Sequence, residues 1–309
     1  MKIVFMGTPD FAVPCLKKLA ESSHDVMAVF TQPDKPKGRG YKMIPTPVKK
    51  AAMEYDIPVY QPQSLRKGSD AETSLEILNK ISPDLIVVTA YGQILPKEIL
   101  TLPKYGCINI HASLLPKYRG AAPINWCILN GETKTGVTSM KMSEGLDTGD
   151  MLIKSETAIG ENETYQQLYE RLAVMGGEVL AQTIKSLEEG TLIPQKQDDS
   201  LSCYSPMIRK EMSALDFSKP AFEIHNIIRG VTGFTSLGGK RLKVFGSVIE
   251  NSESPDAANG EIVVPETFTV KCGDGGLVSF TEVQLEGSKR LSADVFLRGR
   301  KLVKGEILG

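Results

Sequence analysis

Four short runs near the start of the chain are apolar at nearly every position, and they constrain the fold more than any other feature of the sequence. They are KIVFM (2–6), DVMAVFT (25–31), DLIVVTA (84–90) and CINIH (107–111). A strand covered on both faces needs such a run, whereas a strand with one wet face alternates apolar and polar residues. Helical patterns such as FAVPCLKKLAES and TPVKKAAMEY separate the runs. The alternation predicts an α/β fold built on an open, mostly parallel, Rossmann-like sheet.

The pattern continues as far as about residue 189. We expect further strands at 135–142 and 151–159, on either side of a loop that contains SEGLDTGD. Apolar residues then recur about every 3.6 positions, which predicts a helix over 164–187. These elements extend the same α/β domain.

A linker and a second domain follow. Residues 190–207 lose the periodicity and gather Gly, Pro, Asp and Ser, which is typical of a linker. Beyond them, short alternating segments with regularly spaced turn residues predict a smaller antiparallel, OB-like β-barrel. A chain of 309 residues is long enough for two such cores. The expected division is a domain 1–189, a linker 190–207 and a barrel domain 208–309.

Several classes of protein are disfavoured by what the sequence lacks. The five cysteines are widely spread and form no Cys-x-x-Cys pair, so neither a disulfide framework nor a thiolate metal site is expected. No apolar run approaches the roughly 18 residues of a membrane span, and MKIVFMGTPD lacks the features of a signal peptide. GTPDFA lacks the glycines of a dinucleotide fingerprint, and no phosphate-binding Gly-Lys-Ser/Thr occurs. We therefore expect a cytoplasmic protein without a membrane segment or a nucleotide cofactor.

Asn109 and His111 are the first candidate pair for chemistry. Residues two apart in a strand point to the same face, and here they lie near the carboxyl end of a predicted strand. Ligands of open α/β sheets bind at that end. Asn can donate a hydrogen bond to an oxyanion, and His can exchange a proton near neutral pH, which together suit acyl transfer. The alternative is a buried turn in which both side chains only satisfy backbone groups.

The segment GLDTGD (145–150) supplies a candidate carboxylate, Asp147. Asp-Thr-Gly also occurs in aspartic proteases, but that chemistry needs a second such carboxylate and this chain has one copy. A lone Asp among glycines is usually a turn former. If Asp147 reaches His111, it would orient the imidazole and support its charged form.

A basic segment is the third signal. Residues 34–50 contain six basic residues against one acid, in a chain whose net charge is only −1. The segment also contains several Pro and Gly residues, which discourage regular structure. Such a long, basic loop suits a phosphate backbone, although a solvated surface loop is the simpler interpretation of the charges alone.

Taken in order, these segments resemble the methionyl-tRNA formyltransferase family over nearly all 309 residues. GTPDFAVPCL resembles its opening, QPDKPKGRG its basic insertion, and EVQLEGSKRLSADVFLRG part of its C-terminal domain. INIHASLLPKYRGAAPINWCILNGETKTGVT, followed by GLDTGD, resembles its formyltransferase core. Other 10-formyltetrahydrofolate enzymes share that core, so the opening and the basic insertion are the parts that distinguish this family from them. The chain departs after Ile228-Arg229-Gly230, where VTGFTSLGG replaces the family's usual Pro-Trp-Pro turn.

The resemblance implies an enzyme that transfers a formyl group from 10-formyltetrahydrofolate to the α-amino group of methionyl-initiator tRNA, giving N-formylmethionyl-tRNA. It implies that Asn109, His111 and Asp147 are catalytic and that no metal takes part. The implied folate contacts are Tyr91, Gly92, Gln93, Ile94, Leu95, Ser113, Leu114, Leu115 and Pro116. The implied tRNA contacts are Lys35, Lys37, Arg39 and Lys42, assisted by the barrel domain, in a monomeric protein.

Two other functions stay open at this stage. A formyltransferase that acts on an amino-sugar nucleotide can share the core and a similar second domain, but a long basic loop has little purpose with so small an acceptor. A non-catalytic tRNA-binding protein of the same fold would be favoured by the loss of one of the three catalytic residues. All three are present in this chain.

Overall fold

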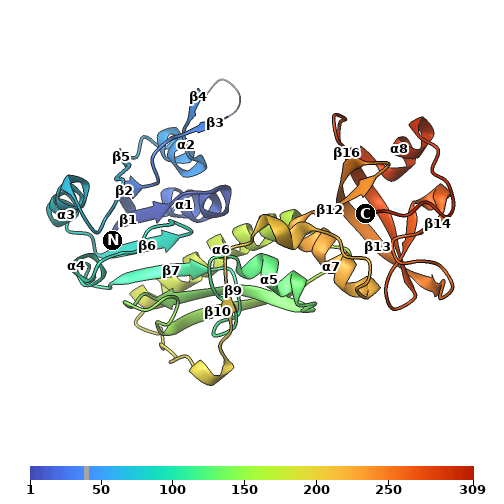
Figure 1. Cartoon of the computed structure of the whole chain (residues 1–309). Helices are drawn as coiled ribbons and strands as arrows, with labels where there is room; N and C mark the ends of the chain where they lie inside the picture. Colours follow the sequence, from blue (N-terminus) through green and yellow to red (C-terminus); the bar gives the residue numbers. More distant parts are fainter. Residues whose placement is uncertain (38–41) are drawn as a thin grey trace. The chain divides into compact units, whose positions relative to one another are not determined.

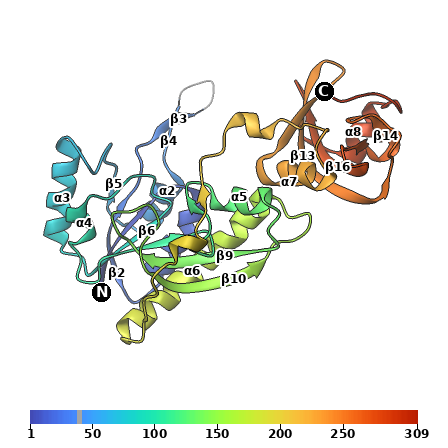
Figure 2. The same cartoon turned by 60° about the horizontal axis from the view of Figure 1, so that its bottom comes forward.

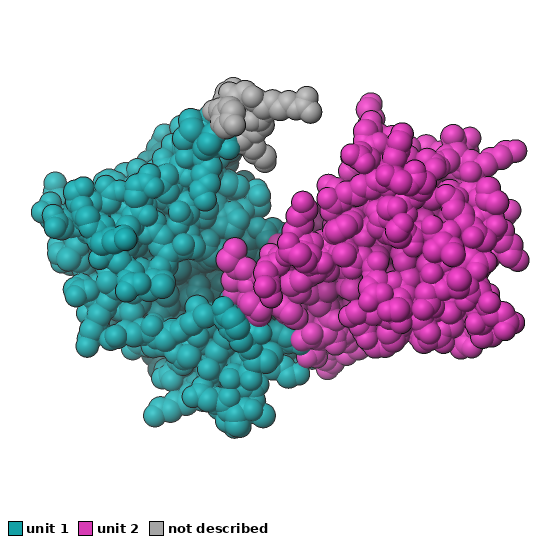
Figure 3. Space-filling view, viewed as in Figure 1, with its two compact units in different colours: residues 1–120, 136–157, 169–204 teal, residues 121–135, 158–168, 205–309 magenta. Residues whose placement is uncertain are grey.

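The computed structural model describes residues 1–37 and 42–309, which form two compact units. Figure 3 shows the two units in separate colours. Unit 1 comprises residues 1–120, 136–157 and 169–204. Unit 2 comprises residues 121–135, 158–168 and 205–309. Both units are therefore discontinuous in sequence, whereas the division predicted from the sequence, 1–189, 190–207 and 208–309, is continuous.

Unit 1 contains most of a seven-stranded sheet with the order β10-β9-β7-β6-β1-β2-β5 (Figure 1). Its strands are β1 (Lys2–Gly7), β2 (Asp25–Phe30), β5 (Val59–Tyr60), β6 (Leu85–Thr89), β7 (Cys107–His111), β9 (Lys134–Lys141) and β10 (Met151–Ala158). The neighbours from β5 to β7 are parallel, and β9 is antiparallel to β7. The expected mostly parallel α/β sheet is confirmed.

Helices cover both faces of this sheet. The side chains of Val4, Ile86 and Cys107 point to one face and pack with residues of α3 (Ser69–Ile81) and α4 (Lys97–Leu100). On the other face Ile110 lies against α6 (Tyr165–Glu188), where a Cβ atom on Gly176 would be 3.2 Å from the Ile110 Cγ2 atom. The same glycine adjoins Cys15 of α1 (Val13–Ala20), and α2 (Pro47–Glu54) packs on α1. Burial on both faces explains why the strand sequences are apolar throughout.

The basic segment contains regular structure that its Gly and Pro content does not predict. β3 (Lys35–Lys37) pairs with β4 (Lys42–Ile44) in an antiparallel hairpin. Pro36 fits because proline is tolerated in a strand that need not donate to a neighbour on both sides. The base of the hairpin is closed by a buried hydrogen bond between the Thr31 and Thr46 hydroxyl groups at 2.8 Å. Arg39 lies outside the described residues.

Unit 2 contains an antiparallel sheet with the order β12-β13-β16-β15-β14, and β17 pairs with β16. Figure 2 labels β13, β14 and β16 of this sheet. Its strands are β12 (Gly233–Leu237), β13 (Lys240–Glu253), β14 (Ile262–Val264), β15 (Thr269–Lys271), β16 (Gly276–Leu285) and β17 (Leu291–Ser292). Its helices are α5 (Pro123–Leu129), α7 (Ala221–Val231) and α8 (Ala293–Gly299). The expected C-terminal antiparallel sheet is confirmed, and α7 is an element that the strand-like patterns of this region did not predict.

The last residues of the chain join the two ends of this sheet. Ile262 of β14 donates a backbone hydrogen bond to the Glu306 carbonyl, and Leu308 donates to the Gly260 carbonyl. Gly309 then donates to the Ser236 carbonyl of β12. Backbone bonds through residues 305–309 thus close the sheet in the manner of a barrel.

The Pro-Trp-Pro departure lies where α7 meets β12. Thr232 ends the helix with a positive φ of 62°, and β12 begins at the next residue, Gly233. A Cβ atom on Gly233 would lie 2.7 Å from a methyl carbon of Leu215, so only glycine fits without movement. The residues that replace the Pro-Trp-Pro turn are therefore closely packed.

Two 3-10 turns of unit 1 are at Asp10–Ala12 and Asp199–Leu201, and two of unit 2 are at Lys210–Ser213 and Pro265–Thr267. No helix formed by the described residues is long and apolar enough to cross a membrane.

Candidate active site at the carboxyl end of β7

Asn109 and His111 occupy the last part of β7, where the sequence placed them. Asn109 pairs with Val88 of β6 on one side and with Met140 of β9 on the other, and His111 pairs with Thr138. Both side chains share the face of Cys107, which packs against α4. His111 is the final residue of the strand and is buried. The two side chains therefore sit side by side at the carboxyl edge of the sheet.

The imidazole of His111 has one nitrogen committed to the fold. Its Nε2 atom lies 2.9 Å from the Tyr118 carbonyl oxygen. A carbonyl can only accept a hydrogen bond, so Nε2 carries the proton and donates it. Nδ1 is left as the nitrogen that can take up or release a proton. This assignment follows from the tertiary contact and has no signature in the sequence.

Asp147 lies beside that second nitrogen. Its Oδ2 atom is 3.7 Å from His111 Nδ1, and the two side chains are only 12% and 7% exposed. The same oxygen accepts a 2.8 Å hydrogen bond from the Gly120 amide. Limited exposure strengthens electrostatic interactions in the pair. The carboxylate therefore faces the second nitrogen of the ring in a largely buried setting.

The loop that carries Asp147 has a backbone conformation that is unfavourable for most residues other than glycine. Asp147 has a φ of 51°, in the left-handed region. Two residues later, a Cβ atom on Gly149 would lie 1.6 Å from the Lys141 carbonyl oxygen. Glycine is therefore required where the loop returns to β10.

Of Asn109, His111 and Asp147, which we call the trio, Asn109 is the one whose side chain makes no hydrogen bond within the described residues. Its side chain is partly buried, and among residues 1–37 and 42–309 no group forms a hydrogen bond with it. A partly buried amide without a protein partner retains both of its N–H donors for a ligand. Within the described residues no three His, Cys, Asp or Glu side chains gather closely enough to hold a metal ion.

The expected folate residues of the first loop, 91–95, differ widely in exposure. Tyr91 and Leu95 are buried in the core under the sheet, and burial raises the pKa of the Tyr91 phenol. The Tyr91 hydroxyl has no hydrogen-bond partner among the described residues. The Gln93 side chain bonds to the neighbouring loop, where it donates to the Pro62 carbonyl and accepts from the Leu65 amide. Ile94 is 64% exposed and, of these side chains, is the one most available for a ligand.

The second expected folate segment, 113–116, directly follows His111 and is held rigidly. Thr138 of β9 donates to the Ser113 carbonyl at 2.7 Å and accepts from the Leu115 amide at 3.2 Å. The Ser113 hydroxyl in turn donates to the Lys117 carbonyl. Leu115 is buried against Met140 and Met151, whereas Leu114 and Pro116 are partly exposed.

The basic segment 34–50 is held at its base by an ion pair between two of its own residues. Lys49 donates to the Asp34 carboxylate at 2.7 Å, and Gln61 bonds to both residues. The Lys49 hydrogen bond, helped by Gln61, lowers the pKa of Asp34. Lys49 is therefore neutralised locally, while Lys35 lies exposed on β3. Lys37 and Lys42 are paired in the backbone register of β3 and β4.

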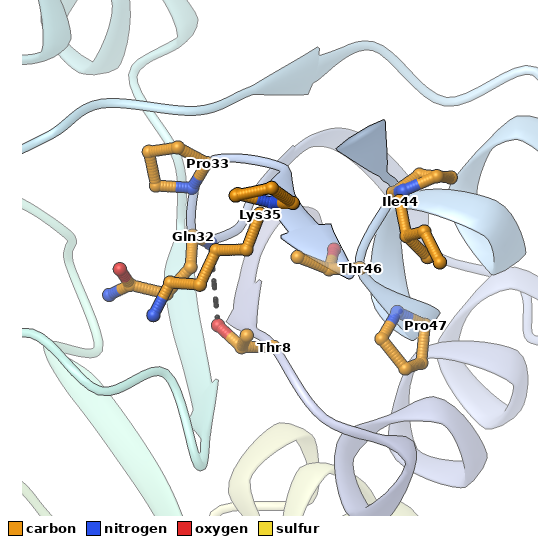
Figure 4. A pocket seen from close by; sticks show the side chains of 9 residues that line it. Thr8, Gln32, Pro33, Lys35, Ile44, Thr46 and Pro47 are labelled. Carbon is orange, nitrogen blue, oxygen red and sulfur yellow. Dashed lines mark hydrogen bonds between the residues drawn. The ribbon is translucent and has the colours of Figure 1, made fainter. Parts of the chain in front are cut away.

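A cavity of about 250 Å³ opens at the base of the hairpin (Figure 4). It lies beyond the carboxyl ends of β1 and β2, where the Gln32 amide donates to the Thr8 hydroxyl at 3.4 Å. The lining residues are Thr8, Gln32, Pro33, Lys35, Pro36, Ile44, Pro45, Thr46 and Pro47. Asn109 and His111 are not among them, so this cavity is distinct from the candidate site, although both lie at the carboxyl edge of the sheet.

Two residues that the sequence did not single out contact the Asp147 loop. Gln197 donates to the main-chain carbonyls of Asp147 and Gly149, and its own carbonyl accepts from Arg119. Gln197 lies in the predicted linker, where no periodic pattern or motif marks it. Arg119 lies within the quoted core motif, but its spacing carries no sign that it reaches residue 197.

Comparison with known proteins places this geometry in a family. A sequence model described as formyl transferase matches residues 1–184, and one described as formyl transferase, C-terminal domain, matches residues 207–301. A methionyl-tRNA formyltransferase of Citrifermentans bemidjiense is 52% identical, over 100% of this chain and 96% of the relative. That of Caldanaerobacter subterraneus subsp. tengcongensis is 48% identical over 100% of both chains.

The chain belongs to the methionyl-tRNA formyltransferase family. The resemblance drawn from the quoted motifs is thereby confirmed, as is the expectation that the protein is a formyltransferase. Among solved structures, an N-formyltransferase from Helicobacter canadensis in complex with folinic acid and dTDP-3-aminofucose superposes with a TM-score of 0.69. It is 22% identical and covers 91% of this chain and 98% of its own. At that identity the likeness shows the shared fold alone.

Proposed function

We propose that this protein transfers the formyl group of 10-formyltetrahydrofolate to the α-amino group of methionyl-initiator tRNA. The observation that carries the proposal is the trio itself. His111 keeps Nδ1 for chemistry, Asp147 lies beside that nitrogen, and the Asn109 amide has no protein partner among the described residues. The full-length similarity to methionyl-tRNA formyltransferases supports the choice of acceptor.

The chemistry proceeds by addition and elimination. The amine attacks the formyl carbon, and the electrons of the carbonyl double bond move to oxygen and form an oxyanion. Asn109 donates to this oxyanion through its amide, and His111 donates through Nδ1–H. A single donor of this kind commonly contributes about 3–4 kcal/mol to the transition state. Collapse of the oxyanion breaks the bond to N10 of the folate.

Asp147 assists the proton movements. The attacking amine must lose a proton, and the departing N10 must gain one. Because His111 Nε2 is bound to the Tyr118 carbonyl, only Nδ1 exchanges protons, and Asp147 Oδ2 lies 3.7 Å from it. The carboxylate therefore stabilises the imidazolium and helps to relay the amine proton toward N10 through water.

The folate is held by two loops at the carboxyl edge of the sheet. Residues Tyr91 to Leu95 follow β6, and residues Ser113 to Pro116 follow β7. Since Tyr91, Leu95, Ser113 and Leu115 are buried, the contacts of these positions are made mainly by their backbone. Exposed Ile94 and the partly exposed Leu114 and Pro116 supply apolar surface for the pterin and its linker. No metal takes part in this scheme.

The acceptor tRNA is held by the basic segment. Lys35, Lys37, Arg39 and Lys42 supply positive charge for the phosphate backbone, and unit 2, with the predicted barrel domain 208–309, assists. The anchoring of the hairpin by Thr31 and Thr46, and by Asp34 and Lys49, supports this role because it provides a firm base for the charges. We also propose that the protein acts as a monomer in the cytoplasm.

A comparison of acceptors tests the proposal. The protein is incubated with 10-formyltetrahydrofolate and one of three acceptors: methionyl-initiator tRNA, a charged elongator tRNA, or an amino-sugar nucleotide. Formylation of the initiator tRNA, with little product from the other two, is expected. Formylation of the sugar alone would overturn the assignment in favour of a sugar formyltransferase. A protein that binds tRNA without formylating anything would instead be a non-catalytic relative.

A further inference from the structure

The side chain of Gln197 holds the main chain of the Asp147 loop. Gln197 Nε2 donates to the Asp147 carbonyl at 2.8 Å and to the Gly149 carbonyl at 2.7 Å. Each carbonyl can only accept, so the orientation of the Gln197 amide is determined by its partners. Both of its N–H donors are used on the loop that carries the catalytic carboxylate.

The acceptor end of the same amide is also occupied. Gln197 Oε1 accepts from Arg119 Nε at 2.9 Å, and Arg119 Nη2 pairs with Asp199 at 2.7 Å. The Arg119 side chain is only 12% exposed, whereas that of Asp199 is 82% exposed. The inner bond is therefore shielded, and the outer ion pair is open to solvent and weak.

These bonds form a closed circuit around Asp147. Gly120, the residue after Arg119, donates its amide to Asp147 Oδ2, while the Arg119 side chain reaches the Asp147 backbone through Gln197. The segment that carries Gln197 is itself tied to β10, because Gln195 and Met151 exchange two backbone hydrogen bonds of 2.8 Å. The circuit is thus attached to the sheet through the segment that carries Gln197.

The circuit stabilises a backbone that needs support. Asp147 has a φ of 51°, which a non-glycine residue adopts only when its surroundings favour it. A peptide that rotated out of this region would turn its carbonyl away from Gln197 and move Oδ2 away from His111 Nδ1. Loss of the Gln197 donors therefore frees the backbone torsions that direct the carboxylate toward His111.

We propose that Gln197 is a positioning residue for catalysis, holding the Asp147 main chain so that its carboxylate faces His111. Arg119 supports it by fixing the amide. The inference rests on the proposed function, in which Asp147 acts on His111. It gives a role in formyl transfer to the segment between α6 and β11 (Tyr204–Ser205), which the sequence predicts to be a linker.

The first test uses two substitutions of Gln197 and a matched control. Gln197→Ala removes the whole side-chain amide. Gln197→Glu keeps the size of the side chain and its contact with Arg119, but replaces both N–H donors with an acceptor oxygen. We expect either variant to lower kcat roughly ten- to a hundredfold, as small misplacements of catalytic groups do, with KM for both substrates within about twofold. Asp199→Asn, which weakens only the exposed ion pair, should retain wild-type kcat. Thermal unfolding of each variant verifies that it is folded.

A double-substitution cycle separates positioning from a general structural role. If Gln197 acts through the Asp147 carboxylate, the combination of Asp147→Asn with Gln197→Ala should be no slower than Asp147→Asn alone. Independent damage to the fold would instead multiply the two losses. Multiplied losses, or a wild-type kcat in the Gln197 variants, would overturn the inference. Absence of formyl transfer by the wild-type protein would overturn the proposed function, so the two failures are distinguishable.

Discussion

His111 Nδ1 lies 3.7 Å from Asp147 Oδ2, while Nε2 of the same ring donates to the Tyr118 carbonyl. One nitrogen therefore holds the ring in place, and the other faces the carboxylate. Nε2 thus makes a hydrogen bond within the fold, and Nδ1 remains available to a ligand or a proton. The arrangement also makes the placement of the His111 and Asp147 side chains depend on loops from different parts of the chain.

Asn109 and His111 should each be needed for the chemical step. Replacement by alanine of either residue removes an oxyanion donor, so we expect kcat to fall by about a hundredfold or more, with a smaller effect on tRNA affinity. Single-turnover formylation with saturating tRNA measures the step directly. An unchanged rate in either variant would mean that the residue serves only the fold.

Asp147→Asn keeps the shape of the side chain and removes its charge. The Gly120 amide can still donate to the remaining oxygen, so the loop should keep its place. The formylation rate should fall by roughly a hundredfold or more because the imidazolium of His111 loses its stabilising charge. Rate measurements beside circular dichroism check both halves of the expectation. A folded and fully active variant would remove Asp147 from the mechanism.

The salt dependence of tRNA binding tests the basic segment. Phosphate contacts release counterions, so neutralising Arg39 together with Lys42 should flatten the slope of log affinity against log salt by about one to two units. The dissociation constant of 10-formyltetrahydrofolate should not change, since these residues are proposed to contact the acceptor. As a matched control, neutralising Lys49, whose charge is already paired with Asp34, should leave the slope close to wild type. Equal slopes in wild type and double variant would mean a solvated surface hairpin.

Gly149→Ala tests the packing of the loop that carries Asp147. The added methyl group would lie 1.6 Å from the Lys141 carbonyl oxygen, so the loop must move. We expect a destabilisation of about 1–3 kcal/mol in chemical unfolding, together with a loss of formylation rate. Gly299→Ala is the control, because a Cβ atom there meets nothing within 4 Å. Equal activity of the two variants would show that the loop tolerates displacement.

The stability of the protein should depend on His225 below neutral pH. This buried residue of unit 2 donates from Nε2 to the Glu161 carbonyl and accepts from the Ser247 hydroxyl at Nδ1. Burial, with a smaller contribution from the Arg229 charge, lowers its pKa from the ordinary 6.5. The unfolded chain therefore binds the proton first as the pH falls. The neutral histidine contributes fully above pH 6.5, and its contribution is lost as the pH falls through the lowered pKa.

The measurement is urea unfolding at several pH values between roughly 5 and 7.5, for the wild type and for His225→Phe. The variant is expected to be less stable at neutral pH because it leaves the Ser247 hydroxyl and the Glu161 carbonyl unpaired. Its stability should nevertheless fall less steeply below pH 6.5, since the two proteins differ in this one titrating group. Parallel curves would contradict the role given to burial.

Local patterns in the sequence determined the sheet and one half of the site. The apolar runs that became β1, β2, β6 and β7 were recognisable because strands buried on two faces need them. The pairing of Asn109 with His111 on one face followed from the two-residue period of a strand, which any strand obeys. The Gly and Pro content of the basic segment was a weaker guide, since Lys35 and Lys42 lie in paired strands.

Only the tertiary structure decided how the site is completed. The contact of Asp147 with His111 and the hydrogen bonds of Gln197 join residues that are far apart in sequence. The bond from His111 Nε2 to the Tyr118 carbonyl spans only seven residues, but it depends on how the intervening loop folds back onto β7. The burial of Tyr91 is of the same kind, because the loop after β6 turns its side chain under the sheet. A hydrogen bond depends on distance and angle in space, and no local periodicity records which distant groups will meet. The sequence determined which strand carries Asn109 and His111, and the packing of loops against that strand determined which groups their side chains meet.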